Sequence, residues 1–315
     1  MIKRSAQLLH ERLSRAPRPL AQAYLSMLSA ISRRLLPQSV GRRVHNSVCG
    51  YGYSWPQMEF AARRVVLGEA TQVALVPHLG EFDDQALFLS RLGYEAAVFA
   101  WLEHNAAQTY DLVIEIGANV GIYTVFLDAL FRRSPPGTTP PRIVSFEPSR
   151  EAYRRLVENL KANGARFVAA YQAAVGAASG LQPFFEPQGH LTNGSLLREF
   201  SEIFSQSIAE NMVIVLAASE LDRWLEPSRK TLIKIDVEGF EPDLLAALKP
   251  LIERYRPDLL IEVLPFTLDA LNNSAALTGY GRFLLTSGGL EQAPTLFVSD
   301  RHRDWLLRWP DNSRP

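Results

Sequence analysis

The sequence has few of the features that mark secreted, membrane-spanning or polyanion-binding proteins. Its 315 residues contain one cysteine, Cys49, which excludes an internal disulfide and favours a reducing, cytoplasmic compartment. No apolar run reaches the roughly 18 residues that a membrane-spanning helix needs. Lys plus Arg and Asp plus Glu number 33 each, so the net charge gives no reason to expect a polyanionic partner. Together with a hydrophobic content of 47%, these absences favour a globular enzyme.

The charges are unevenly distributed along the chain. Residues 1–50 contain nine Lys or Arg and one acid, Glu11, whereas the remaining 265 residues contain 24 basic and 32 acidic residues. Because the basic charge is confined to an N-terminal arm and the body is acidic, nucleic acid is not expected as a partner. We predict a basic helical extension over residues 1–74 and one large α/β domain over residues 75–315.

The N-terminal arm is expected to form two helices separated by Pro17 and Pro19. The second helix has an apolar stripe (Leu20, Tyr24, Met27, Leu28, Ile31 and Leu35) and is accompanied by Arg33, Arg34, Arg42 and Arg43. One interpretation is a helical cap on the α/β domain, with the arginines solvated. Another is peripheral contact with an anionic membrane surface, and an organelle targeting segment is a third.

Residues 110–121, YDLVIEIGANVG, predict the first unit of a nucleotide-binding domain. A β-branched apolar run is followed by a glycine turn and then by apolar residues at helical spacing. The polar and glycine positions of the turn are Glu115, Gly117, Asn119 and Gly121. They depart from the G-x-G-x-x-G spacing of dinucleotide sites. S-adenosylmethionine (SAM) carries a cationic amino group and no phosphate, so this acid and these open turn amides suit it.

A second short strand, within residues 141–149 (PRIVSFEPS), ends in Glu147, which is placed to accept two hydrogen bonds from a ribose diol. Ala174 lies in an AVG segment after the third strand. The motifs E-x-GAN-x-G, FEPS, AVG, LD-x-WL and IKIDVEG-x-E follow in this order. The region from about 75 to 265 thereby resembles the FkbM family of class I SAM-dependent methyltransferases.

The resemblance implies a Rossmann-like seven-stranded sheet with helices on both faces, an inserted β segment between strands 3 and 4, and an N-terminal helical extension. It also implies SAM as cofactor, O-methylation, and a sugar, glycan or polyketide-type acceptor. Cofactor contacts are expected from Glu115, Gly117, Asn119, Gly121, Glu147 and Ala174. Two alternatives remain, an NAD-dependent oxidoreductase and a non-catalytic adenosine-binding scaffold.

Three charges interrupt the strand that begins at Thr231. Lys234, Asp236 and Glu238 alternate with apolar residues, so they share one face near the carboxyl end of a parallel strand, where ligands bind. Asp236 could orient or deprotonate the acceptor, Glu238 could act as a second catalytic group, and Lys234 is a candidate acceptor contact. A structural pair of Lys234 with Glu262, and a Mg²⁺ site, are the alternatives. No compact metal motif occurs, so we predict no metal.

The region between the third and fourth strands is unusually long. Residues 181–187 and 211–217 are predicted as added strands. The loop between them contains His190, Asn193 and Ser195, and the Asn193-Gly194 pair is by itself a hairpin-turn signal. The family resemblance implies a loop over the acceptor, which makes His190 a possible base and Asn193 and Ser195 acceptor contacts.

The C-terminal part is expected to complete the sheet. Residues 281–287 and 295–300 are predicted as its closing strands, and the family resemblance implies that the last-inserted strand is antiparallel. The tail after residue 300 is expected to pack through Trp305 and Trp309.

Overall fold

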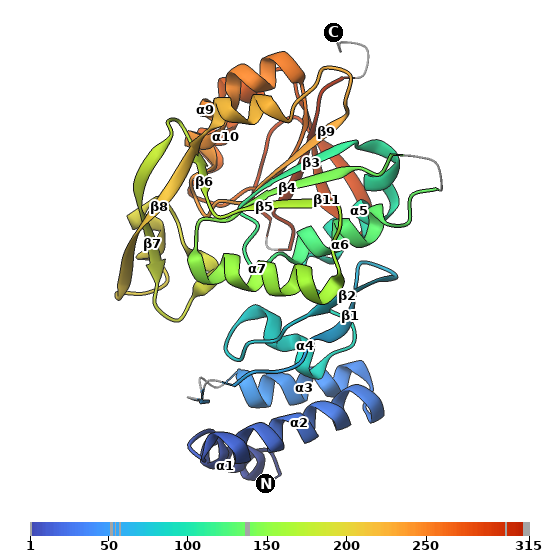
Figure 1. Ribbon diagram of the computed structural model, residues 1–315, viewed down its shortest axis with the longest axis vertical. Coiled ribbons are helices and arrows are strands. Elements are labelled where there is room, and N and C mark those ends of the chain that lie inside the picture. Colours follow the sequence, from blue (N-terminus) through green and yellow to red (C-terminus); the bar gives the residue numbers. More distant parts are fainter. Residues whose placement is uncertain are drawn as a thin grey trace. The chain divides into compact units, whose positions relative to one another are not determined.

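The computed structural model describes residues 2–50, 53, 55–56, 58–135, 139–299 and 301–310. The chain forms two compact units, Met1–Tyr94 and Glu95–Pro315, which are drawn in Figure 1. The boundary that the sequence predicts, at residue 75, stays a prediction. Among the described residues, no helix combines the length and apolar character needed to cross a bilayer.

The first unit is a set of helices followed by a β-hairpin and a short helical turn. Pro17 and Pro37 precede the second and third helices, where a proline fits because the N–H that it lacks would have no partner within the helix. β1 and β2 pair antiparallel from Arg63 opposite Leu75 to Leu67 opposite Thr71. The elements are α1 (Ile2–Ser14), α2 (Arg18–Leu35), α3 (Gln38–Cys49), β1 (Arg63–Leu67), β2 (Thr71–Leu75), η1 (Phe82–Asp84) and α4 (Gln85–Phe88).

Helix α2 buries a different face from the apolar stripe in the sequence. Its buried residues are Ala21, Leu25, Ser29 and Ser32, and the two serine hydroxyls donate to the carbonyls of Leu87 and Phe88. These small side chains let α2 pack closely on α4. The stripe residues Leu20, Met27, Ile31 and Leu35 are exposed instead. Arg33 is not simply solvated, because its guanidinium donates to the carbonyls of Ala86 and Leu89.

The second unit is built on one mostly parallel sheet, in the order β12-β11-β13-β10-β9-β3-β4-β5. The central strands β3 and β9 are buried along their whole length and are apolar except for Glu115 and Lys234, as expected for strands that are buried on both faces. This confirms the Rossmann-like fold, and β12 adds an eighth strand at one edge. The strands are β3 (Leu112–Ile116), β4 (Arg142–Phe146), β5 (Val168–Tyr171), β9 (Thr231–Ile235), β10 (Asp258–Glu262), β11 (Gly281–Thr286), β12 (Gly289–Ala293) and β13 (Asp304–Arg308).

Helices cover both faces of this sheet. In Figure 1, α5, α6 and α7 lie on one side and α9 and α10 on the other. Local signals set their ends: Ser149 caps α7 by accepting from the Ala152 N–H, and Gly164 ends it at φ 58°. The elements are α5 (Ala96–Thr109), α6 (Ile122–Phe131), α7 (Arg150–Asn163), η3 (Ala218–Arg223), α9 (Glu241–Tyr255), α10 (Leu268–Asn272) and η4 (Ala275–Leu277).

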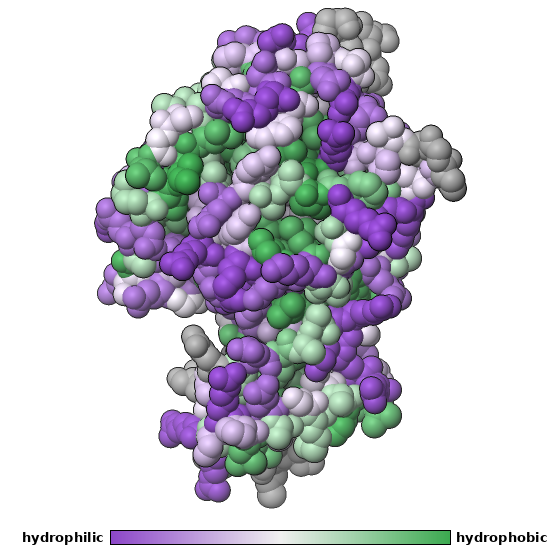
Figure 2. Space-filling model, viewed as in Figure 1, coloured by the Kyte–Doolittle hydropathy of each residue, from purple (hydrophilic) through white to green (hydrophobic). Residues whose placement is uncertain are grey.

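The predicted insertion forms its own three-stranded sheet, in the order β6-β8-β7. β6 (Ala174–Gly176) precedes β7 (Gly180–Pro187) and β8 (Ile208–Ala217), which pair antiparallel along their length; η2 (Leu191–Asn193) and α8 (Arg198–Ser201) lie between those two strands. Both added strands are thus confirmed. Figure 2 shows apolar surface over β7 and β8, where Leu181, Met212 and Ile214 are exposed.

The closing strands differ in part from the prediction. β11 forms where expected, but the strand predicted at 295–300 is wrong: residues 295–299 form no strand, and residue 300 lies outside the described residues. The closing strand is β13, which pairs antiparallel with both β10 and β11. Trp305, Leu306 and Leu307 are fully buried there, so the denser apolar run takes the central position.

Candidate functional site

A cavity opens at the carboxyl ends of β3, β4 and β9, the edge where open α/β sheets bind ligands. It encloses about 600 Å³ of empty space, its mouth included. The turns after the three strands form its floor, and the insertion forms another wall. The lining comprises Ile116, Gly117, Asn119, Phe146, Glu147, Pro148, Ser149, Ala173, Ala174, Val175, Phe184, Leu191, Thr192, Gly194, Leu196, Asp236, Val237, Glu238 and Phe240.

The glycine turn after β3 holds two of these segments together. Gly117 has φ +87°, and a Cβ there would lie 1.7 Å from the Asp236 carbonyl oxygen. The Asp236 N–H in turn donates to the Ile116 carbonyl at 3.0 Å. Gly121, also at positive φ, would place a Cβ 2.2 Å from Leu156. Packing of the turn on its neighbours therefore requires both glycines, and Gly121 itself does not line the cavity.

Glu147 is the carboxylate most firmly fixed at the cavity wall. One oxygen accepts the Asn119 N–H and the other accepts the Ser149 N–H, both at 2.7 Å. Burial raises the pKa of Glu147 to about 7, although these two backbone donors act in the opposite direction. Each oxygen keeps a free lone pair, so Glu147 can accept two further hydrogen bonds.

Glu115 lies elsewhere, inside the sheet and outside the cavity lining. Its Oε2 accepts hydroxyl hydrogen bonds from Thr124 at 2.5 Å and Ser145 at 3.0 Å. Burial raises its pKa, and the nearby charge of Lys234 opposes that shift. Glu115 is also the register partner of Lys234 on the neighbouring strand β9. These contacts make Glu115 a counter-charge within the sheet.

Lys234 and Asp236 form an ion pair next to the cavity. The Lys234 Nζ lies 2.8 Å from Asp236 Oδ2 and 4.4 Å from the centre of the Tyr123 ring. Burial alone would lower the pKa of Lys234, but Asp236, Glu115 and Glu95 raise it above its usual value. The lysine is buried and does not line the cavity. Its ammonium therefore holds the carboxylate of Asp236, and Asp236 does line the cavity.

The alternative pair of Lys234 with Glu262 is not formed. Glu262 Oε1 instead lies 3.9 Å from Arg303. Burial and the charge of Asp236 raise the pKa of Glu262 to about 8. Within the described part of the chain, Asp236, Glu238 and Glu262 do not converge on one point as metal ligands would.

Glu238 occupies an unusual backbone conformation beside Asp236. Its φ is +52°, a region that non-glycine residues seldom adopt, and it lines the cavity. Burial, together with Asp236, raises the pKa of Glu238 well above its usual range. The Ser195 hydroxyl donates to the Glu238 carbonyl at 2.8 Å. Glu241 accepts the N–H groups of Val237 and Gly239, so the Glu238 loop is held from two sides.

The loop residues of the insertion divide into two groups. Thr192 and Gly194 line the cavity, although neither is predicted as an acceptor contact, whereas the predicted residues His190, Asn193 and Ser195 do not line it. His190 is exposed, and Ser195 is buried behind Glu238. The pair Asn193-Gly194 is not a hairpin turn, because Asn193 ends η2 and Gly194 is extended at φ −72°. A Cβ at Gly194 would lie 2.6 Å from the Phe184 ring, so ring packing selects the glycine.

Comparison with known proteins identifies the family of this chain. The family model of the methyltransferase FkbM domain matches residues 115–305. No match was found among curated proteins.

Solved structures give weak similarities. A methyltransferase FkbM from Methylobacillus flagellatus KT is 16% identical, with a TM-score of 0.41 over 64% of this chain and 44% of that chain, so the match spans less than half of that protein. A ribosomal protein L11 methylase from Lactobacillus delbrueckii subsp. bulgaricus is 12% identical, with a TM-score of 0.41 over 79% and 100% of the two chains. A putative methyltransferase from Streptococcus mutans, in complex with SAH, is 13% identical, with a TM-score of 0.38 over 67% and 94%.

Proposed function

Because this chain belongs to the FkbM family of SAM-dependent methyltransferases, we propose that it methylates a hydroxyl oxygen of a sugar, glycan or polyketide-type acceptor. The observation that carries the proposal is the charge of the cavity lining. Its ionisable side chains are all acidic, Glu147, Asp236 and Glu238, with no Lys or Arg among the lining residues. Such a wall favours a cationic cosubstrate and a neutral, hydroxyl-bearing acceptor over a phosphorylated one.

The residues present fit SAM. Glu147 has acceptor capacity left on both carboxylate oxygens and can hold the two ribose hydroxyls. Ala174 and Val175 add an apolar wall, and the turn at Gly117 and Asn119 brings backbone to the cavity surface. Burial raises the pKa of Glu147 to about 7 because it destabilises the ionised carboxylate, and a cation bound nearby would stabilise that ionised form.

SAM supplies an electrophilic methyl group on a cationic sulfur, and in-line substitution on such a group depends mainly on alignment. A neutral hydroxyl becomes a good nucleophile only as its proton leaves. Asp236, held by Lys234 at 2.8 Å, would accept that proton. The carbon–oxygen bond would form as the methyl carbon–sulfur bond breaks, and S-adenosylhomocysteine would leave as a neutral thioether. Glu238, whose raised pKa favours its protonated form, donates a hydrogen bond to the acceptor. Ser195 fixes the Glu238 backbone that this role requires.

The test is methyl transfer from SAM with a deuterated methyl group to panels of free sugars, glycans and hydroxylated polyketides. Mass spectrometry and NMR would locate the label. Label on oxygen, lost in Asp236→Asn, supports the proposal. Label on nitrogen would contradict the hydroxyl acceptor and indicate an amine acceptor instead. Binding of NAD in place of SAM, measured by calorimetry, would overturn the activity itself.

We also propose that the first unit makes peripheral contact with anionic membranes. Leu20, Met27, Ile31 and Leu35 form an exposed apolar stripe on α2, and Arg34, Arg42 and Arg43 are exposed on α2 and α3. An apolar stripe with nearby arginines suits an anionic lipid surface. The chain should sediment into the pellet with anionic vesicles, and the Leu35→Glu variant should stay in the supernatant. Equal sedimentation with neutral vesicles would contradict the electrostatic part.

A further inference from the structure

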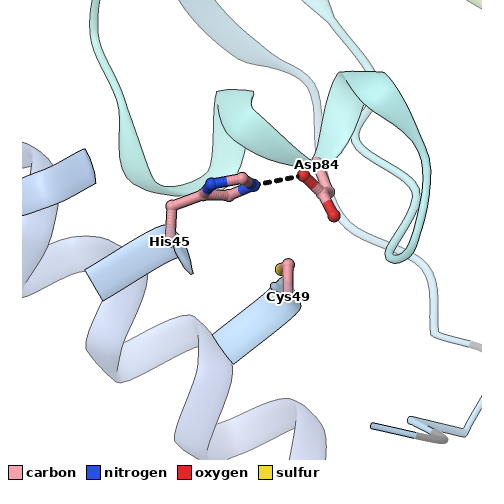
Figure 3. Close-up of side chains that lie close together, drawn as sticks. All are labelled: His45, Cys49 and Asp84. Atoms are coloured by element: carbon pink, nitrogen blue, oxygen red, sulfur yellow. Dashed lines mark hydrogen bonds and ion pairs between the residues drawn. The ribbon is translucent and has the colours of Figure 1, made fainter. Parts of the chain in front are cut away.

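Three side chains of the first unit converge on one point that the methyltransferase site does not use. Figure 3 shows His45 and Cys49 pointing from α3 toward Asp84 at the end of η1. One ligand atom from each of the three lies within 4.8 Å of the others. His45 and Cys49 are four residues apart, so one helix face carries both, and Asp84 approaches from a separate segment.

The three groups differ in chemistry. His45 Nε2 lies 2.6 Å from Asp84 Oδ1, and the imidazole is mostly covered. Burial, together with Asp84, raises the pKa of the Cys49 thiol above its usual value. The thiol is therefore not an activated nucleophile, which needs a lowered pKa. An imidazole, a thiol and a carboxylate whose ligand atoms lie within 4.8 Å of one another are a donor set for a metal ion.

We propose that His45, Cys49 and Asp84 bind a divalent transition-metal ion of the Zn²⁺ type. The ligand atoms are His45 Nε2, Cys49 Sγ and a carboxylate oxygen of Asp84, and water supplies the fourth position of a tetrahedron. On binding, the thiol and the imidazole Nε2 release their protons to solvent, and the ion takes the place of both protons. A nitrogen, sulfur and oxygen set suits Zn²⁺ better than the hard ions Mg²⁺ and Ca²⁺.

Surrounding groups already orient two of the ligands. The Gly80 N–H donates to Asp84 Oδ2 at 3.1 Å, which leaves Oδ1 directed at His45. Asn46 Oδ1 lies 3.1 Å from His45 Nδ1 and can accept its proton, which assigns Nε2 to the metal. The ion would tie α3 to the η1 segment.

The experiment is a titration of the full-length, tag-free chain with Co²⁺, followed by displacement with Zn²⁺. Since Cys49 is the only cysteine, a thiolate-to-cobalt charge-transfer band must come from this site. We expect that band together with visible bands of tetrahedral Co²⁺, and loss of both on adding one equivalent of Zn²⁺. Cys49→Ser should abolish the charge-transfer band and weaken Zn²⁺ binding at least ~100-fold, since even outer-shell changes cost 10–100-fold.

A neighbouring pair provides the matched control. His78 Nδ1 lies 2.8 Å from Asp83 Oδ2 in the same unit, and neither residue belongs to the cluster of His45, Cys49 and Asp84, so His78→Gln should leave the titration unchanged. Asp84→Asn should weaken Zn²⁺ binding while keeping the charge-transfer band at saturating Co²⁺. Calorimetric SAM binding and thermal unfolding show that each variant is folded. The proposal is overturned if the wild-type chain gives no charge-transfer band, or if Cys49→Ser binds Zn²⁺ as the wild type does.

Discussion

Two glutamates at the ends of neighbouring parallel strands have different surroundings. Glu115 lies on the last-but-one position of β3, opposite Ser145 and Lys234, and is covered by the hydroxyls of Thr124 and Ser145. Glu147 lies one residue beyond β4, where no further strand position covers it, and it lines the cavity. An acid inside a paired strand is covered by its neighbours and balances a charge within the sheet. An acid one residue beyond the end of the strand is available to a ligand.

The sequence predicts a cofactor contact for both glutamates, because each lies in a motif shared with the family. In the structure only Glu147 can touch a ligand in the cavity. Glu115 acts on the site through Lys234, whose ammonium holds Asp236. The two residues therefore predict different measurements: ligand affinity for Glu147 and stability for Glu115.

The largest effect is expected from Glu147→Ala. Loss of two hydrogen bonds to a charged acceptor, each contributing about 1.5–3 kcal/mol, should weaken SAM binding by roughly 10²–10⁴-fold. Calorimetric titration with SAM and S-adenosylhomocysteine measures this. The matched variant Glu115→Ala separates the two glutamates. If both variants lose affinity equally, the distinction between them fails.

The pH dependence of SAM binding sharpens the same distinction. Only the ionised carboxylate of Glu147 accepts from both ribose hydroxyls, and its pKa is raised to about 7. Affinity should therefore fall as the pH drops below about 7, approaching ~tenfold per pH unit, and should level off above it. Titrations from about pH 5.5 to about pH 8.5 test this. A flat profile would mean that another group holds the ribose.

The next effect is on turnover. Asp236→Asn removes the proposed proton acceptor but keeps the size of the side chain, so SAM affinity should change little. Because alignment dominates methyl transfer, the loss in kcat should lie near the lower end of the general-base range, about 10²-fold. Single-turnover kinetics at saturating SAM measure it. An unchanged rate would remove Asp236 from the mechanism.

Glu115→Ala should mainly cost stability. It leaves the hydroxyls of Thr124 and Ser145 without their acceptor and Lys234 without its sheet partner. We expect a loss of about 1–3 kcal/mol in the free energy of unfolding, with SAM affinity within about threefold of wild type. Denaturant unfolding with and without SAM gives both quantities. Wild-type stability would contradict the counter-charge role.

Particular residues show which parts of the fold and of the candidate site the sequence predicts. The largely apolar segments around Ile114 and Ile233 predict buried parallel strands, and both form as expected. Strand alternation also places Lys234 and Asp236 together correctly. Alternation does not tell which acid a neighbouring strand will cover, so Glu115 and Glu147 could not be separated.

Other features depended on contacts distant in sequence. The face that α2 buries follows from small serines bonding to α4 carbonyls, whereas hydrophobicity alone favours the opposite face. β13 lies in the tail because its three consecutive buried residues fill the space between β10 and β11. The Asn193-Gly194 pair predicts a turn, yet the structure requires a glycine at 194 because a larger side chain would clash with the Phe184 ring. Such selection by a tertiary neighbour leaves no local pattern.

The smallest effects concern the insertion loop, where Ser195 and His190 extend the comparison. Ser195→Ala removes the hydroxyl that holds the Glu238 carbonyl, so kcat should fall by about 3–10-fold, consistent with one hydrogen bond of about 1 kcal/mol. His190 is exposed and does not line the cavity, so His190→Ala should leave kcat within about twofold of wild type. Steady-state kinetics of the two variants side by side decide the matter. A large loss in His190→Ala with an intact Ser195→Ala would mean that the loop closes over the acceptor with its histidine inward, making His190 the base and Asp236 its partner in orienting the hydroxyl.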